Sequence, residues 1–282
     1  MLRTNTIRLL DDRDAHAVLD VLARDPVANV FVTSRVEALG LDSWRLGAEM
    51  WGYADRATGR LAALCYSGAN LVPVGTQPEA VHAFAERARR QGRRCSSIVG
   101  PRDAVGPMWR QLLPHWGEAR DVRPEQPLMA TSRPSAVAGD ERVRRVRPDE
   151  IDLLMPACVA MFTEEVGVPP DMGDGGAMYR SRVAELIAAG RAFAIVDEQR
   201  VVFKAEVGAV TEAACQVQGV WVEPRLRGRG IGTAGMAALV DEALSSVAPI
   251  VSLYVNDYNV PARRAYEKVG FTDVGCFMSV LF

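Results

Sequence analysis

The sequence predicts a mixed α/β protein of two domains, each built on a central, largely antiparallel, twisted sheet flanked by helices. The first observation is the length of 282 residues, which favours about two domains of roughly 150 residues each. The second is that short β-rich runs alternate with segments of helical period. The third is that the order of these elements in the second half repeats their order in the first, which indicates a tandem arrangement.

The first half opens with a short apolar strand and two helices. Val18, Leu19 and Leu22 recur at helical spacing. Three β-rich runs divided by polar or glycine turns then indicate an antiparallel meander. In chain order we predict a strand near 7–10, helices at 11–24 and 29–39, strands at 49–53, 61–66 and 69–74, a helix at 78–90, a strand at 96–99, a helix at 103–115 and an extended segment at 127–130.

A segment at 132–141 is small, polar and interrupted by Pro134, as is typical of linkers. We therefore expect one domain at 1–131 and another at 142–282. In the second domain we predict a strand at 143–146, helices at 148–161 and 179–189, strands at 192–196, 201–210 and 214–222, a helix at 231–247, a strand at 250–255, a helix at 262–269 and a closing pair of strands within 272–282.

Composition excludes several classes of function. The net charge of −2 gives no general attraction for nucleic acid or an anionic membrane. The five cysteines lie far apart, so we expect small core residues in a reducing compartment and neither disulfides nor a metal site. No apolar run reaches about 18 residues and no signal sequence is evident at the start, so we expect a cytoplasmic protein with no membrane contact.

The most informative stretch is an arginine- and glycine-rich turn that joins the predicted strand at 214–222 to the next helix. Its glycines let several backbone N–H groups converge at the positive end of that helix, which favours binding of a phosphate group. The turn consists of Arg227, Gly228, Arg229, Gly230, Ile231, Gly232 and Thr233. The first half has Pro78 and Glu79 at the corresponding place, so we expect only the second domain to hold an anionic ligand.

A dinucleotide-binding turn is the alternative for this stretch. The segment 230–235 satisfies the pattern G-x-G-x-x-G, and Asp257 lies at a suitable distance. In that fold, however, the first glycine directly follows its strand, whereas residues 223–229 intervene here. The dinucleotide alternative is therefore disfavoured.

Two blocks of sequence resemble the GNAT superfamily of N-acetyltransferases. The segment 227–232 fits that family's Arg/Gln-x-x-Gly-x-Gly/Ala loop, and 259–271 fits its pattern of Asn-x-x-Ala, then Tyr, then Gly-Phe. The blocks are correctly ordered and separated by a strand, and the close resemblance covers about 201–282. The whole chain looks like a tandem GNAT protein with a degenerate N-terminal copy.

The resemblance implies acetyl-CoA as co-substrate and assigns roles to the second domain. It implies that the pantetheine arm pairs with the backbone of Val220, Trp221 and Val222, that the segment 227–233 binds the diphosphate, and that Asn259 lies near the arm. Tyr266 matches the family's general acid, which would protonate the leaving thiolate. An ordinary core tyrosine is the alternative for Tyr266.

A carboxylate is the expected general base, because all three histidines lie in the first half. Glu206 on the strand at 201–210 is the first choice. The alternative is that Glu206 simply faces solvent from its strand. Glu164 and Glu165, two adjacent carboxylates, are expected to bind a cationic acceptor, and their alternative is a solvated loop pair.

The resemblance thus implies an acetyl-CoA-dependent N-acetyltransferase that transfers an acetyl group directly to a primary amine of a small molecule or peptide. One alternative is a non-catalytic acetyl-CoA-binding sensor or interaction module. Another is transfer of a longer acyl chain, which depends on a cleft around Met161, Phe162 and Phe203. The acceptor and the choice between monomer and homodimer stay open.

Overall fold

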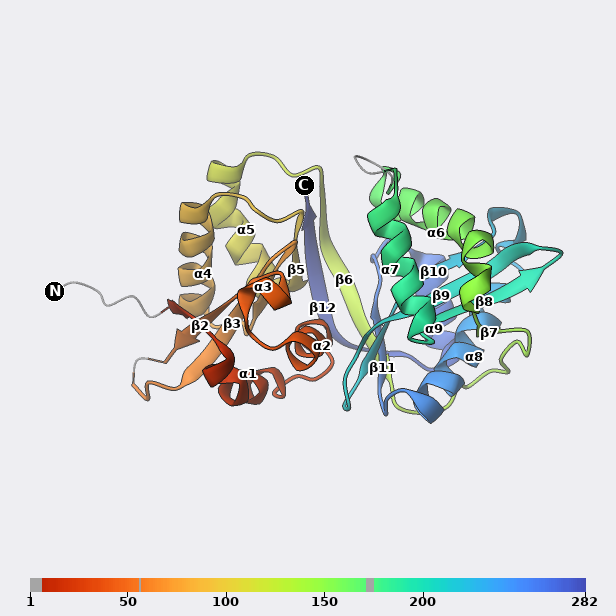
Figure 1. The fold of residues 1–282 in the computed structure, drawn as a ribbon, viewed down its shortest axis with the longest axis horizontal. Coiled ribbons are helices and arrows are strands. Elements are labelled where there is room, and N and C mark those ends of the chain that lie inside the picture. Colours follow the sequence, from red (N-terminus) through yellow and green to blue (C-terminus); the bar gives the residue numbers. More distant parts are fainter. Residues whose placement is uncertain (1–6, 56, 171–174) are drawn as a thin grey trace. The chain divides into compact units, whose positions relative to one another are not determined.

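A computed structural model describes residues 7–55, 57–170 and 175–282 and divides the chain into two compact units (Figure 1). The first unit contains the chain up to Met129 together with Tyr254–Tyr258 and Asp273–Phe282. The second contains Ala130–Leu253 and Asn259–Thr272. The units therefore interleave along the chain, unlike the contiguous domains that we expect from the sequence.

The first unit contains a mixed sheet in the order β1-β2-β3-β4-β5-β12-β6. Strands β1 to β4 form an antiparallel meander, β5 runs parallel to β4, and β12 pairs antiparallel with β5. These strands are β1 (Ile7–Leu9), β2 (Glu49–Ala54), β3 (Leu61–Ser67), β4 (Asn70–Val74), β5 (Ser97–Pro101), β6 (Asp121–Thr131) and β12 (Thr272–Leu281).

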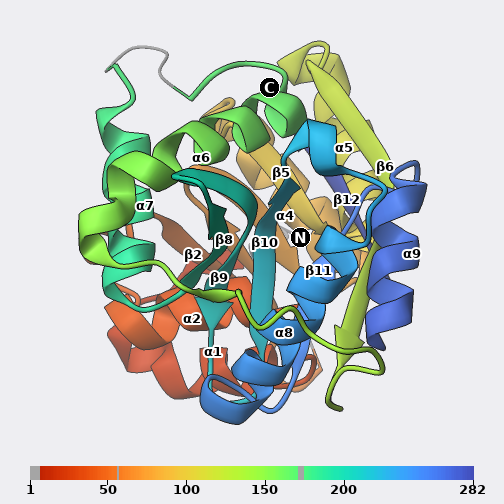
Figure 2. The same ribbon diagram turned by 90° about the vertical axis from the view of Figure 1, so that its right-hand side faces the viewer.

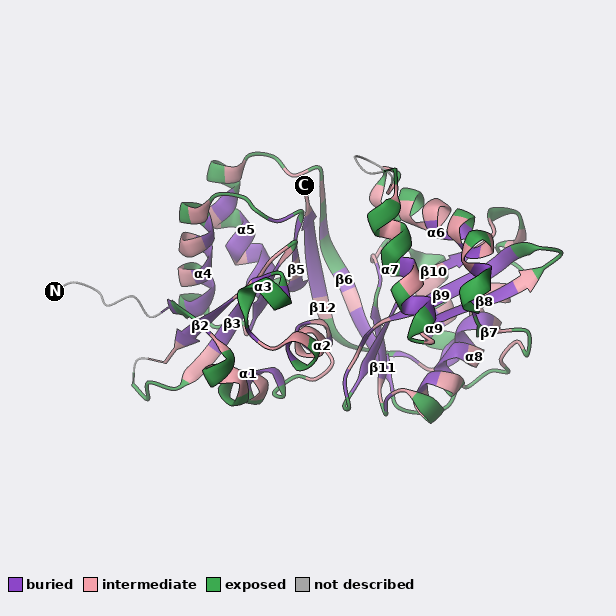
Figure 3. Cartoon of the chain, in the orientation of Figure 1, coloured by how far each residue is buried: buried purple, intermediate pink, exposed green. Residues whose placement is uncertain are grey.

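Two hydrophobic clusters form the core of the first unit. Alternate residues of β3 separate them: Ala63 and Cys65 pack with the cluster that includes α4 and α5, and Leu64 and Tyr66 pack with the cluster that includes α1 and α2. The helices are α1 (Ala15–Leu22), α2 (Val30–Leu39), α3 (Ser43–Leu46), α4 (Pro78–Gln91) and α5 (Arg102–Trp116). Figure 3 shows the buried strands between more exposed helices.

The second unit contains a sheet in the order β11-β10-β9-β8-β7. Only the β10–β11 pair is parallel, and the other pairs are antiparallel. The strands are β7 (Arg144–Arg145), β8 (Ala192–Asp197), β9 (Arg200–Val210), β10 (Cys215–Val222) and β11 (Val251–Tyr254), and the helices are α6 (Ile151–Val166), α7 (Ala177–Ala188), α8 (Ile231–Ser246) and α9 (Val260–Val269).

Strand β9 lies near both α6 and α8 of the second unit (Figure 2). Glu206 contacts Cys158 of α6, whereas Phe203 packs under α8. A Cβ atom at Gly235 of α8 would lie 2.7 Å from the Phe203 ring, so glycine is what allows this close approach. Phe203 is consequently fully buried core, not the lining of an acyl cleft.

The segment 132–141, expected to be a linker, packs on α8 and α9 of the second unit. The Ser135 amide donates to Asp241 Oδ1 (2.7 Å), and the Asp140 amide donates to the Ala234 carbonyl (3.0 Å). A Cβ atom at Gly139 would lie 2.8–2.9 Å from Ala238, so the two backbones are in direct contact. The segment is therefore a structured part of this unit.

The predicted element order is found with two differences. The sequence gives no signal for the four-residue helix α3, and the predicted pair of closing strands is wrong, because Thr272–Leu281 is one continuous strand. The core role expected for the cysteines is confirmed for four of them: Cys65, Cys95, Cys158 and Cys215 are buried, Cys276 is half-buried, and all five are free thiols.

Candidate functional site

Strands β10 and β11 separate after a short stretch of pairing. They pair at Cys215↔Val251 and Gln216↔Ser252, and β10 then continues to Val222. Within the described part of the chain, β11 offers no partner to 217–222. This edge of β10 can therefore accept an extended ligand that pairs with the backbone. The edge includes Val220, Trp221 and Val222, which the resemblance assigns to the pantetheine arm.

A β-bulge interrupts the pairing of the same part of β10 with β9. Gln218 pairs with Glu206 and Trp221 pairs with Lys204, so two β10 residues oppose one residue of β9. The first of the two is Gly219, whose φ of +61° favours glycine. A Cβ atom there would also lie 3.1 Å from Lys204 Nζ and 3.2 Å from Glu206 Oε2, so glycine makes room for both charged groups.

The first part of the arginine- and glycine-rich turn, 227–230, is exposed, and its last part, 231–233, forms the first residues of α8. Gly228 and Gly230 have φ of +74° and +83°, and α8 begins at Ile231. Among the described residues, no side chain accepts a hydrogen bond from the amides of 228–233. The first amides of a helix lack intrahelical partners and attract anions, so the turn has the groups that a diphosphate needs.

Arg227 is held at the base of this turn. Its Nε donates to the Val222 carbonyl (3.0 Å), and its terminal nitrogen donates to Glu164 Oε2 (2.7 Å). The other oxygen of Glu164 accepts a hydrogen bond from Trp221 Nε1 (3.2 Å). Glu164 therefore lies in the helix α6 and not in a loop. Its carboxylate is hydrogen-bonded to two residues that are predicted to bind the donor.

Glu206 is buried in an ion pair, so the solvent-facing alternative is wrong. Only 7% of its side chain and 1% of the Lys204 side chain are exposed. Its Oε1 accepts from Lys204 Nζ (2.5 Å) and lies 3.8 Å from Cys158 Sγ, while Oε2 faces Gln218 Nε2 (3.5 Å). Burial raises the pKa of Cys158 to about 11, so this thiol stays protonated and can donate to the carboxylate.

Sequence reasoning missed the partners of Glu206. Lys204 stands two positions before it on the same strand, so the period of two would have placed both on one face. Cys158 comes from α6, and Tyr179 of α7 donates to the Cys158 carbonyl (3.0 Å) and packs on Phe162 (5.2 Å between ring centroids). These contacts from distant segments have no signal in the local sequence.

Tyr266 has a buried ring on α9. It packs against Phe271, with 5.9 Å between ring centroids. Burial, and then the charge of Glu165, raises the pKa of Tyr266, so its phenol keeps the proton that a general acid must supply. The effect of Glu165 also means that the carboxyl end of α6 lies within electrostatic range of Tyr266.

Asn259 forms the N-cap of α9. Its side-chain oxygen accepts a hydrogen bond from the Ala262 amide (3.3 Å), and Pro261 stands in the first turn. This arrangement accounts for the beginning of the helix that carries Tyr266. A role of Asn259 beside the pantetheine arm stays a prediction.

The first unit repeats the short parallel pairing but not the turn. Strands β4 and β5 pair at Asn70↔Ser97 and Leu71↔Ile98. On β4, Pro73 has no backbone N–H to donate. The connection from β4 to α4 is only 75–77, with Gly75 as its one glycine, and α4 begins at Pro78. This edge lacks the bulge, the glycine-rich turn and the arginines of the second unit.

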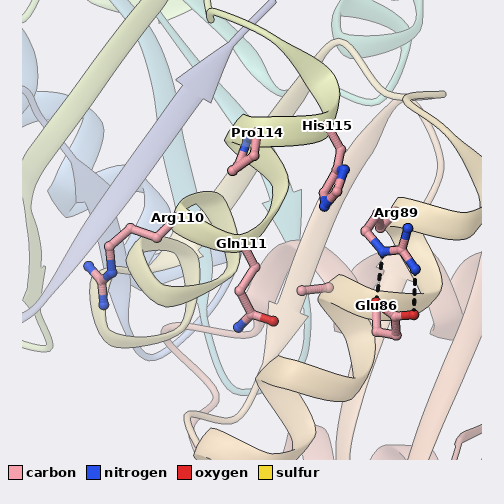
Figure 4. Close-up of a pocket in the computed structure, with 7 residues that line it drawn as sticks. Glu86, Arg89, Arg110, Gln111, Pro114 and His115 are labelled. Atoms are coloured by element: carbon pink, nitrogen blue, oxygen red, sulfur yellow. Dashed lines mark hydrogen bonds and ion pairs between the residues drawn. The ribbon is translucent and has the colours of Figure 1, made fainter.

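A pocket of about 250 Å³ lies in the first unit between α4 and α5 (Figure 4). It is lined by Ala85, Glu86, Arg89, Arg110, Gln111, Pro114 and His115. No predicted site residue is among them. In the described ranges, no cluster of histidine, cysteine, aspartate and glutamate suits a metal ion, and no helix has both the length and the apolarity to cross a membrane.

Two known families match separate parts of the chain. Residues 172–271 match the family described as "Acetyltransferase (GNAT) family". Residues 48–154 match a family described as a domain of unknown function, DUF4081. A mycothiol acetyltransferase of Mycobacterium leprae is 40% identical over 62 residues, so the match spans about a fifth of this chain and of that relative.

Solved structures resemble the fold along nearly the whole chain. An acetyltransferase of the GNAT family from Colwellia psychrerythraea is 14% identical over 98% of this chain and 99% of its own, with a TM-score of 0.56. A tandem GNAT protein from the clavulanic acid biosynthesis pathway is 14% identical over 98% of both chains, with a TM-score of 0.55. At this identity the likeness concerns the fold alone. Residues 172–271 therefore match the GNAT acetyltransferase family, and the solved structures show that the chain shares the fold of such proteins.

Proposed function

We propose that this chain is an acetyl-CoA-dependent N-acetyltransferase whose reaction takes place in the second unit. The main support is the row of uncapped amides at 228–233, which only 223–227 separate from the unpaired edge of β10. The turn would hold the diphosphate, and the edge would pair with the pantetheine arm. The first unit has Pro73 on its corresponding strand and no such turn, so it would hold no acyl donor. This is what a degenerate copy of the domain predicts.

The proposed chemistry needs a base because the acceptor amine is protonated at neutral pH. An amine with a pKa of about 10.4 requires roughly 4 to 5 kcal/mol to reach its free base at pH 7. Glu206 would take this proton on Oε2, since Oε1 already accepts from Lys204. The amine nitrogen then bonds to the thioester carbon without a covalent enzyme intermediate.

The remaining steps use the backbone and Tyr266. A backbone N–H among 220–222 would donate to the oxygen that becomes negative as the carbon turns tetrahedral. When the carbon–sulfur bond breaks, Tyr266 would give its proton to the thiolate, and the second proton that the nitrogen loses as the amide forms would restore the phenol. Burial raises the pKa of Tyr266, so the phenol is protonated at neutral pH and has a proton to give.

Donor binding tests the first half of the proposal. Calorimetry with acetyl-CoA should detect binding that is lost in Gly230→Val, since a side chain at φ +83° distorts the turn. Gly92→Val is the matched control, because Gly92 has a similar φ of +74° and equally open surroundings but lies in the first unit. Unchanged binding in Gly230→Val would refute the site.

Turnover separates the transferase from a non-catalytic sensor. Thiol release would be followed with a panel of small amines, peptide N-termini and lysine side chains. Tyr266→Phe and Glu206→Gln should bind acetyl-CoA but release thiol at least tenfold more slowly, the usual scale for loss of acid–base catalysis. Binding without thiol release from any amine would favour the sensor.

The acyl chain and the acceptor need separate measurements. A series of acyl-CoA donors of increasing length tests the longer-chain alternative, which loses one of its supports because Phe203 packs under α8. The relative named for mycothiol matches over 62 residues only, so we propose no acceptor from it.

A further inference from the structure

Glu164 connects α6 to both parts of the proposed donor site. One carboxylate oxygen accepts from Trp221 on the bulged strand, and the other accepts from Arg227 at the start of the turn. The Glu164–Arg227 pair is half-exposed, with 45% and 47% of the two side chains open to solvent. The pair is therefore within reach of ligands and weak enough to be exchanged.

Arg227 is the member of this pair that a diphosphate would attract. Its Nε is fixed on the Val222 carbonyl, so the guanidinium stays at the base of the turn whichever anion it binds. A guanidinium has five N–H donors and binds phosphate strongly in two-point contacts. A diphosphate beside the amides of 228–233 would bring more negative charge to Arg227 than one carboxylate does.

The surroundings of Glu164 indicate what its carboxylate could do once released. Glu164 contacts Trp221, which belongs to the β10 edge proposed for the pantetheine arm, so its carboxylate lies beside the proposed donor. Burial, and then the charge of the neighbouring Glu165, raises the pKa of Tyr266 on α9, so the carboxyl end of α6 also brings negative charge to the proposed reaction centre. A cationic amine approaching that centre would meet this charge.

We propose that Glu164 is the counter-ion that the donor's diphosphate displaces from Arg227, and that the released carboxylate then binds the ammonium group of the acceptor. This inference rests on the proposed function. With Glu164 in this role, the acceptor binds as a cation. The acceptor also binds after the donor, because the donor releases the carboxylate. Glu164 acts as a binding residue and takes no part in proton transfer.

Calorimetry on the full chain tests the competition. Glu164→Gln keeps the shape and the contact with Trp221 but removes the charge, so acetyl-CoA should bind about two- to fivefold more tightly, the range expected when one exposed ion pair no longer competes. Glu212→Gln removes one exposed carboxylate from the β9–β10 turn and should leave the affinity unchanged. In an Arg227→Gln background, the effect of Glu164→Gln should disappear.

Steady-state kinetics test the second part. In Glu164→Gln the KM for a cationic amine should rise severalfold while the KM for acetyl-CoA falls. If the parent binds acetyl-CoA and Glu164→Gln binds it equally or more weakly, the competition is refuted and the transferase proposal stands. If the amine KM does not change, Glu164 does not bind the acceptor. If the parent binds no acetyl-CoA, the proposed function itself fails.

Discussion

Lys204→Met should destabilise the protein more than any surface change. The substitution leaves the buried Glu206 carboxylate without its ion-pair partner, and 7% or less of either side chain is exposed. Breaking a buried pair by removing one partner costs about 3 to 5 kcal/mol, because the remaining charge stays desolvated. Cys158 and Gln218 contact the carboxylate at 3.8 and 3.5 Å, but both are neutral donors and cannot replace the charge of the ammonium group.

Urea denaturation followed by circular dichroism measures this loss. The double variant Lys204→Met/Glu206→Leu replaces both charges and should recover most of the stability, to within about 1 kcal/mol of the parent. Arg142→Met is the matched control at the exposed pair with Asp140 and should cost less than about 1 kcal/mol. A loss below 1 kcal/mol for Lys204→Met, or no recovery in the double variant, would refute the reasoning.

Three further predictions concern the second unit. Gly235→Ala would place a Cβ atom 2.7 Å from the Phe203 ring and should cost about 1 to 3 kcal/mol in urea denaturation; an unchanged midpoint would mean that the helix shifts freely. A hydrogen bond from Arg144 lowers the pKa of Glu150 from 4.5 to about 2, so its stabilisation is complete above pH 4.5 and is lost as the pH falls towards 2. Glu150→Gln should therefore flatten the stability curve in that window, and an unchanged slope would contradict the assignment. Asn259→Ala should cost about 1 kcal/mol in thermal denaturation through loss of the helix cap, whereas Asn259→Asp should not.

The sequence best predicted those parts of the candidate site whose residues are close together in the chain. The turn at 227–233 could be recognised because its glycines and arginines are adjacent, and the structure places it at the beginning of α8. The same holds for Asn259, which stands at the first turn of its helix. In both places the backbone conformation follows from residue types a few positions apart.

Contacts between distant segments could not be predicted in this way. Glu164 and Arg227 are 63 positions apart, and only the packing of α6 beside β10 joins them. The expectation of two closing strands failed for a related reason: Gly275 suggests a turn, but antiparallel pairing with β5 from Phe277 to Leu281 keeps 272–281 in one strand. Tertiary pairing here overrides a local turn signal.

The position of β12 affects how this protein can fold during synthesis and where it can be truncated. This strand lies between β5 and β6, and Ser279 donates to Gln126, a residue 153 positions earlier. During synthesis the first sheet therefore stays incomplete between β5 and β6 until 272–281 have been translated, after the second unit. A clone that stops at 131 would lack this strand and expose both its neighbours, so aggregation of such a fragment would say nothing about the fold of the intact chain.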